Sequence, residues 1–181
     1  MYYMFLAEGF EETEALVTLD MLRRADVDVQ TVGIGNIRVK GAHGICVEAD
    51  LHESDTLLDA VDGIILPGGM PGTENLYASE TVMKFVDYCF ANKLLISAIC
   101  AAPIILGRRG YLQDVKAVCF PGFEEELTGA IIENAPSVVC SDIITAKGAG
   151  CVFEFSHNII SYIRDSSCAD EIISVIQHKG L

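Results

Sequence analysis

Short apolar segments alternate with amphipathic helical patterns along this chain, and that alternation restricts its fold more than any other feature. Strands are predicted over residues 2–7, 27–34, 63–66, 94–99, 115–120, 137–140 and 143–146. Helices are predicted over residues 13–25, 79–92, 101–110, 151–164 and 168–177. Strands separated by helices of about 10–15 residues imply a parallel sheet covered on both faces. The pattern therefore predicts an α/β fold, with a small hairpin of residues 37–39 and 45–47 outside the sheet.

The composition indicates a protein with a substantial core. Of the 181 residues, 51% are hydrophobic and 21% are charged, and no repeat or linker interrupts them, so we expect one domain over residues 1–181. The formal net charge of −14 leaves no basic surface for nucleic acid and disfavours anionic membranes. The longest uncharged apolar stretch, residues 94–106, is shorter than the roughly 18 residues that a membrane span needs.

The cysteines indicate a reducing compartment. There are seven of them, an odd number, and several lie in apolar segments as free buried thiols do. No two of them form a C-x-x-C pair, so a structural zinc site is not expected. The amino terminus lacks the basic region of a secretory signal. We therefore expect a soluble, cytoplasmic protein.

Cys100 is the first candidate for chemistry. Ligands of open parallel sheets bind at the carboxyl ends of the strands, and Cys100 directly follows the predicted strand 94–99. Ala98, Ala101 and Ala102 are small enough for the strained strand-to-helix turn of a nucleophile elbow. A sulfur at a helix amino terminus would have its pKa lowered by the helix dipole and by unpaired amides. The spacing alone fits a buried core thiol equally well.

Two further strand ends carry residues suited to assist a thiolate. Gly68 and Gly69 follow the predicted strand 63–66, and glycines leave backbone amides uncovered, as an oxyanion site requires. Glu14 lies in the first turn of a helix, where a carboxyl beside a thiolate would have a raised pKa and act as general acid or base. The alternatives are an ordinary turn and a favourable acid at a helix start. None of the four histidines is well placed to act as a base.

Several sequence blocks resemble the ThiJ/PfpI superfamily, in the branch of the human parkinsonism-associated protein deglycase and its bacterial relatives. In chain order they are GFEETE (residues 9–14), LPGGMPG (66–72), AICAAP (98–103) and GAG (148–150) followed by FEF (153–155). The resemblance covers nearly the whole chain. It implies a flavodoxin-like three-layer sandwich with a mostly parallel central sheet, usually assembled as a homodimer.

The resemblance also implies roles for individual residues. Cys100 corresponds to the reactive, oxidation-prone cysteine of the superfamily, and Glu14 corresponds to its partner carboxylic acid. Gly68, Gly69 and Ala101 correspond to the residues that line the oxyanion and substrate-binding site. The resemblance implies no metal and no organic cofactor.

Two positions depart from the superfamily pattern. Several relatives have a histidine just before the proline that corresponds to Pro121, and here that residue is Phe120, so a cysteine–histidine pair of the protease kind cannot form there. Cys151 follows Gly150 where relatives often have a hydroxyl residue. Close to Cys100 it would act as a resolving thiol, and buried packing is the alternative. Phe120 and Cys151 are therefore expected at the border of the pocket.

The leading functional prediction is a cysteine-dependent, cofactor-free enzyme acting on α-oxoaldehydes or their adducts in stress defence. It would be a protein or nucleotide deglycase (a hydrolase) or a glyoxalase-type lyase, with small aldehydes or glycated groups as substrates. The alternative is a sensor of oxidative stress or a redox-dependent chaperone, acting through oxidation of Cys100 without physiological turnover. A cysteine peptidase is least favoured, and a protein of this fold that has lost its activity is a further alternative.

Overall fold

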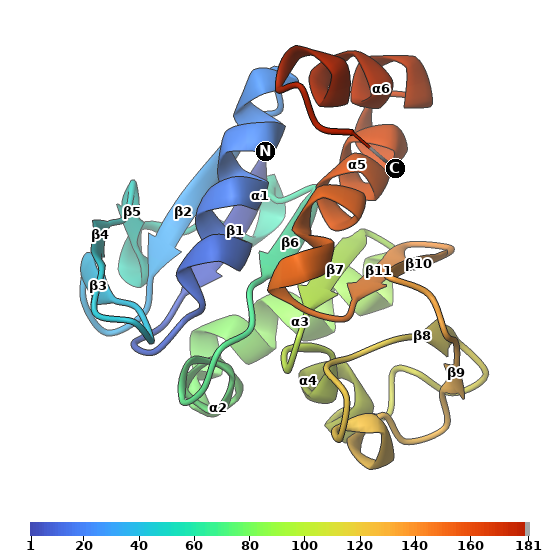
Figure 1. Cartoon of the computed structure of the whole chain (residues 1–181). Coiled ribbons are helices and arrows are strands. Elements are labelled where there is room, and N and C mark those ends of the chain that lie inside the picture. The colour runs from blue at the N-terminus through green and yellow to red at the C-terminus, as the bar shows by residue number, and fades with distance from the viewer. Residues whose placement is uncertain (180–181) are drawn as a thin grey trace.

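The computed structural model describes residues 1–179 and is built around a seven-stranded sheet of order β10-β11-β7-β6-β1-β2-β5 (Figure 1). The strands are β1 (Tyr2–Leu6), β2 (Val29–Gly33), β5 (Leu51–His52), β6 (Gly63–Leu66), β7 (Leu95–Ile99), β10 (Ser137–Cys140) and β11 (Ile143–Ala146). Every neighbouring pair is parallel except β10 with β11. The predicted α/β class with a mostly parallel sheet is confirmed. The last two residues of the predicted domain 1–181 lie outside the described residues.

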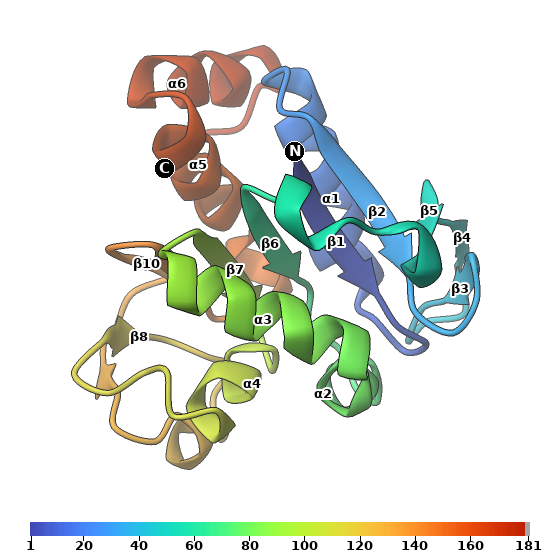
Figure 2. The same cartoon turned by 180° about the vertical axis from the view of Figure 1, so that it is seen from behind.

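Helices cover both faces of the sheet, as the three-layer prediction requires. One face is covered by α1 (Glu12–Arg24), α5 (Val152–Ile163) and α6 (Ser166–Val175), which lie in front in Figure 1. The other face, turned forward in Figure 2, carries α3 (Glu80–Asn92) with α2 (Gly72–Ala78) and α4 (Pro103–Arg108). Among residues 1–179, no helix has both the length and the apolar character to cross a membrane.

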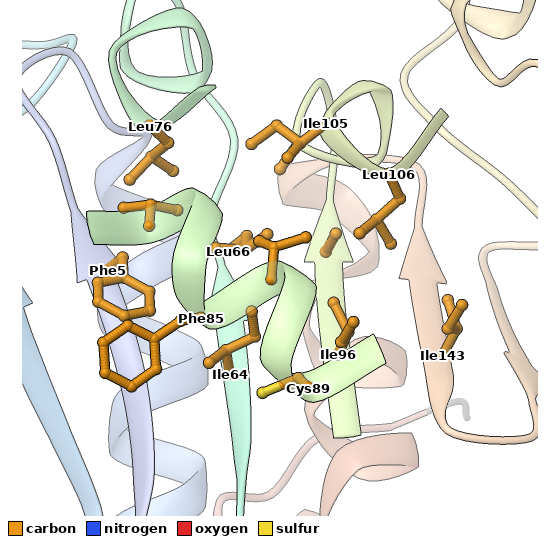
Figure 3. Close-up of a cluster of buried hydrophobic side chains, with 14 of the residues drawn as sticks. Phe5, Ile64, Leu66, Leu76, Phe85, Cys89, Ile96, Ile105, Leu106 and Ile143 are labelled. Carbon is orange, nitrogen blue, oxygen red and sulfur yellow. The ribbon is translucent and has the colours of Figure 1, made fainter. Parts of the chain in front are cut away.

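The central strands are apolar along their whole length because both of their sides are covered. All residues of β6 and β7 are buried, and the rings of Phe5 and Phe85 pack with their centroids 5.3 Å apart between the sheet and α3 (Figure 3). Fully burying each such large side chain contributes about 1.5–3 kcal/mol. This core fixes β6 and β7, and with them the residues at the carboxyl ends of these strands.

The segment after α4 differs from its predicted form. A strand was expected over residues 115–120, but only β8 (Lys116–Ala117) forms, paired with β9 (Ile131–Ile132) in a separate small sheet. The reason is that the next amides find other acceptors: Val118 N donates to Thr145 Oγ1 (2.9 Å) and Phe120 N donates to the Cys100 carbonyl (2.7 Å). The segment therefore runs across the ends of β11 and β7.

Three smaller differences concern the start of one helix and short elements that the sequence pattern did not predict. The helix predicted over residues 101–110 begins at Pro103, because Cys100 adopts a left-handed conformation (φ 65°) and the chain turns before the helix starts. The predicted pattern did not include α2 or β5. It also lacked the short 3-10 turns, which are Glu53–Asp55, Leu58–Ala60, Glu124–Glu126 and Ala149–Cys151.

The predicted hairpin outside the sheet is confirmed. Its strands are β3 (Arg38–Lys40) and β4 (Cys46–Glu48), which pair antiparallel. The buried Glu12 carboxylate on α1 accepts hydrogen bonds from His43 N (2.7 Å) and Ile45 N (3.2 Å) in the turn. Glu12 thereby anchors the hairpin to the start of α1.

Candidate active site

Cys100 lies immediately after β7, in a backbone conformation that few residues adopt. Its φ of 65° is left-handed, which costs a non-glycine residue roughly 1–3 kcal/mol and recurs at functional sites. The surrounding chain holds it there: its N–H donates to the Ala146 carbonyl (2.9 Å), and its carbonyl accepts from Phe120 N (2.7 Å). Cys100 is partly exposed, whereas its neighbours Ile99 and Ala101 are buried. Cys100 is therefore less enclosed than the buried thiols Cys89 and Cys119.

Glu14 approaches the same place from α1. It is only 1% exposed, and its Oε2 accepts a hydrogen bond from Gly68 N (2.9 Å) at the end of β6. The Ala149 amide, in the turn after β11, also bonds to this carboxyl group. Glu11 caps the helix by accepting a hydrogen bond from Glu14 N (2.7 Å). The carboxyl group is thus oriented by loops that follow three different strands.

Gly68 lies directly against both Cys100 and Glu14. A Cβ atom added there would lie 2.6 Å from Cys100 Cβ and 2.7 Å from Glu14 Oε2, so no other residue type fits without displacing one of them. The Cys100 thiol and the Glu14 carboxyl are close enough that each shifts the pKa of the other. The structure therefore brings together the two side chains that the sequence singled out from separate strand ends.

Backbone amides complete the surroundings of the sulfur. The N–H groups of Gly69 and Ala101 are close enough to the Cys100 thiol to act on its pKa, which both lower. Gly69 has a φ of 91°, and a Cβ there would lie 2.5 Å from Glu11 N, so the glycine is required for this close approach. Two converging amides beside a nucleophile are the arrangement that holds a developing oxyanion.

The ionisation of Cys100 differs from the sequence-based expectation. Burial, followed by the charge of the Glu14 carboxylate, raises the pKa of the thiol to about 12, although the Gly69 and Ala101 amides act in the opposite direction. The expectation of a lowered pKa was wrong, because α4 begins only at Pro103 and the effect of a helix dipole falls off within the first turn. With Glu14 ionised, Cys100 is a protonated thiol at neutral pH.

The ionisation of Glu14 is shifted as predicted. Burial, reinforced by the nearby Glu11, raises its pKa to about 7, against hydrogen bonds from Cys100 and from the amides of Gly68 and Ala149 that lower it. Near pH 7 the carboxyl group therefore exists both with and without its proton. Protonation removes the negative charge that holds the thiol pKa high and supplies an O–H donor to the sulfur. Such a group can accept and return a proton during one reaction cycle.

Phe120 lies near Glu14, and Cys151 ends the turn Ala149–Cys151 that follows Gly148. Phe120 is 47% exposed, and its ring lies against Gly148, where an added Cβ would be 3.3 Å from Cδ2. Cys151 is partly exposed, its N–H donates to the Gly148 carbonyl (2.8 Å), and burial, then Glu154, raises its thiol pKa. Its role as a resolving thiol stays a prediction.

One contributor to the site was not predicted from the sequence. The Ala149 amide was not expected to reach Glu14, although the GAG block after a strand was a signal that the backbone approaches a neighbour closely there. His43 is exposed, and its Nδ1 lies 2.9 Å from Glu12 Oε2. Glu11, Glu12 and His43 form a group whose ligand atoms lie within 4.8 Å of one another, as a cation site would require. Their mutual hydrogen bonds and the hairpin amides already account for this group.

Comparisons with known proteins agree with this geometry. The DJ-1/PfpI family model matches residues 2–162. Protein DJ-1 homolog B of Arabidopsis thaliana is 35% identical over 170 residues, which are 92% of this chain and 39% of that protein. This chain thus spans less than half the length of that plant relative. The glutathione-independent glyoxalase DJR-1.2 of Caenorhabditis elegans is 33% identical over 155 residues, 84% of this chain and 82% of that protein.

Solved structures share the fold over nearly the whole chain. The DJ-1 superfamily protein STM1931 from Salmonella typhimurium has a TM-score of 0.93 at 33% identity, covering 99% of this chain and 98% of that one. Oxidised DJ-1 from Toxoplasma gondii has a TM-score of 0.94 at 30% identity, with the same coverage of 99% and 98%.

Proposed function

This chain belongs to the DJ-1/PfpI family, and on that basis we propose that it is a cysteine-dependent, cofactor-free enzyme that converts α-oxoaldehydes into α-hydroxy acids. The observation that carries the proposal is the contact of the Cys100 thiol with the buried Glu14 carboxyl across Gly68, beneath two amides. The nematode relative named as a glutathione-independent glyoxalase supports the same reaction class. Glycated groups that release an oxoaldehyde would supply substrate to the same site.

The first step is addition of the sulfur to the aldehyde carbon. Because burial and Glu14 keep the thiol protonated, the Glu14 carboxylate takes the thiol proton as the sulfur–carbon bond forms. The carbonyl electron pair moves to oxygen, where the Gly69 and Ala101 amides stabilise the charge. Glu14 then returns the proton to that oxygen, which gives a hemithioacetal and restores the carboxylate.

The second step moves a proton from one carbon to the next. Glu14 removes the hydrogen on the carbon attached to sulfur as a proton, which gives an enediolate. It then delivers a proton to the neighbouring carbon, and the hydroxyl proton of the hemithioacetal passes to the former ketone oxygen, which gives a thioester. Water then cleaves the thioester, so that the hydroxy acid leaves and the Cys100 thiol is regenerated. The balance is one aldehyde and one water consumed for each hydroxy acid formed. A Glu14 pKa of about 7 suits a group that must both take and give a proton at neutral pH.

Lactate formation from methylglyoxal tests the proposal. We expect Cys100→Ser and Glu14→Ala each to lose at least about 100-fold in kcat/KM, since general acid–base catalysis alone contributes that much. Cys119→Ser, which removes a buried thiol outside the proposed machinery, should retain the wild-type rate. Equal turnover by Cys100→Ser and by the wild-type protein would refute the proposed function.

A second candidate function, a sensor of oxidative stress or redox-dependent chaperone, is favoured by the pKa of Glu14. A carboxyl group that keeps its proton near pH 7 can donate a hydrogen bond to a sulfinate formed on Cys100. Peptide mass after mild peroxide separates the candidates: selective addition of two oxygens to Cys100 with negligible aldehyde turnover favours the sensor. Earlier oxidation of other cysteines would exclude it.

We also propose that residues 1–181 act as one domain in the cytoplasm and assemble as a homodimer. All seven cysteines are free thiols, which fits a reducing compartment. A groove of about 370 Å³ between α1, α5 and α6 is lined mainly by apolar side chains, and Asp20 and Arg24 provide charges of both signs. A two-fold interface needs such a self-complementary surface.

A further inference from the structure

We propose that Phe120 makes this site selective for uncharged α-oxoaldehydes whose ketone carbon carries an aromatic or bulky apolar substituent. This inference rests on the proposed function and adds the substrate class. Phe120 lies beside Gly148 and Glu14, is aromatic, and exposes nearly half of its surface, and each of these features contributes to the selectivity.

The backbone fixes Phe120 beside the reacting atoms. Its N–H donates to the Cys100 carbonyl at 2.7 Å, so its position is coupled to that of the nucleophile. Its ring lies against the bare backbone of Gly148, 3.3 Å from where a Cβ would stand, and the same Cβ would be 3.9 Å from Glu14 Oε1. Phe120, Gly148 and Glu14 are therefore adjacent, and the ring stands at the edge of the thiol–acid pair.

The ring is held in place but remains accessible. Phe123 packs edge-on against it, with ring centroids 6.4 Å apart and planes at 62°. Phe120 is nevertheless 47% exposed, which is unusual for a phenylalanine held on two sides. The accessible ring surface can stack with a planar apolar group of a substrate whose aldehyde carbon is bound to Cys100.

The charges that act on Glu14 and Cys100 disfavour anionic substrates. The charged groups that shift the ionisation of Glu14 and Cys100 are themselves carboxylates, Glu11 and Glu14. The Lys147 ammonium, on the segment before Gly148, is engaged at 2.8 Å with Asn134 Oδ1. A carboxylated or phosphorylated aldehyde would meet repulsion here, whereas a neutral aryl or alkyl oxoaldehyde would not.

Removal of the Phe120 ring is expected to change KM rather than kcat. An aromatic pair gains about three- to tenfold in binding beyond the burial of area. Phe120 lies beside the bonds that change and has no group to exchange protons, so the gain is uniform between ground state and transition state. Removal of the ring should therefore raise KM for an aromatic substrate and leave kcat nearly unchanged.

Steady-state kinetics with phenylglyoxal and methylglyoxal measure this selectivity. For wild-type protein we expect kcat/KM for phenylglyoxal to exceed that for methylglyoxal by about five- to tenfold. Phe120→Ala should bring the ratio close to one, and Phe120→Leu should leave it in between. Phe90→Ala, which removes a 38% exposed phenylalanine on α3, should keep the wild-type ratio. An unchanged ratio in Phe120→Ala would overturn the inference.

Alkylation of Cys100 provides a readout that needs no turnover. 2-Chloroacetophenone and chloroacetone resemble the two substrates in shape, and the mass of the Cys100 peptide follows their reaction. Relative to Phe120→Ala, the wild-type protein should react at least about threefold faster with the aromatic reagent and equally fast with the aliphatic one. Equal rates with the aromatic reagent refute the role of Phe120. Aromatic preference without Cys100-dependent turnover supports that role and refutes the proposed enzyme instead.

Discussion

At the scale of single residues, Glu12 and Glu14 are two buried acids in the first turn of α1 whose pKa values are shifted in opposite directions. Burial alone would raise the pKa of Glu12, but hydrogen bonds from the His43 side chain and from the His43 and Ile45 amides lower it below its usual range. Glu14 receives weaker compensation, and burial raises its pKa to about 7. Glu12 is therefore an anchor for a hairpin, whereas Glu14 is a group that exchanges protons.

The raised pKa of Glu14 makes the free energy of unfolding depend on pH. Between the ordinary value of 4.5 and about 7, the folded protein holds a proton that the unfolded chain has lost, so stability falls as pH rises through this window. A shift of this size corresponds to about 3 kcal/mol. Glu14→Gln cannot ionise, and its stability relative to wild type should rise by about 2–3 kcal/mol from pH 5 to pH 8.

Urea unfolding at pH 5 and pH 8 measures this difference. The control is Glu125→Gln, which changes an exposed acid in the turn Glu124–Glu126 and should follow wild type at both pH values. Parallel pH dependence in Glu14→Gln and wild type would show that the Glu14 pKa is not raised in the folded protein.

At the scale of elements, the site is the meeting point of loops that follow β1, β6, β7 and β11. Arg108 on α4 connects the elements downstream of two of these loops. It pairs with Glu74 on α2 (2.9 Å) and with Glu126 (3.0 Å), and its guanidinium lies 5.2 Å from the centre of the Tyr77 ring. Where the four loops meet, the backbone of Gly68 lies against both Cys100 and Glu14.

Gly68 and Gly150 make a matched pair of substitutions for this convergence. Gly68→Ala forces a methyl group against Cys100 and Glu14, which should cost about 1–3 kcal/mol of stability and lower the rate of Cys100 alkylation. A Cβ at Gly150 would meet no atom within 4 Å, so Gly150→Ala should stay within about 0.5 kcal/mol of wild type. Thermal unfolding with iodoacetamide kinetics measures both, and equal behaviour of the two variants would contradict the geometry.

Topology explains how much of this could be predicted from the sequence. Cys100, Glu14 and Gly68 follow apolar strands, and parallel strands bring their carboxyl ends to one edge, so their meeting followed from the pattern. The end of β8 did not follow, because the Val118 and Phe120 amides bind the Thr145 hydroxyl and the Cys100 carbonyl, which are distant in sequence. The direction of the thiol pKa also depended on burial that no local pattern encodes.

At the scale of the whole molecule, the proposed homodimer must be compatible with a net charge of −14. Repulsion between acidic copies opposes a dimer, so the interface must be apolar or carry paired charges. The groove between α1, α5 and α6 meets both requirements, with Leu16, Val17 and Met21 beside Asp20 and Arg24. It is formed by the helices on one face of the sheet and leaves the carboxyl ends of the strands free.

A charge placed in this groove should separate the copies. Val17→Asp adds an anion to the apolar lining and should convert a dimer to a monomer, measured by sedimentation equilibrium. Leu57→Asp changes a 60% exposed leucine outside the groove and should leave the dimer intact. A monomeric wild-type protein, or a Val17→Asp variant that stays dimeric, would contradict this assignment of the interface.

The central claim is that Cys100 and Glu14 act as one nucleophile–acid pair, and the most direct test is the fate of a single hydrogen. Under the proposed mechanism, methylglyoxal converted in D₂O gives lactate whose second carbon receives its hydrogen from Glu14, which exchanges with solvent. We predict deuterium at that carbon in most of the product, with Cys100→Ser forming lactate only at the uncatalysed rate. Lactate formed by Cys100→Ser or by Glu14→Ala at the wild-type rate and with the same deuterium content would contradict proton transfer by this pair.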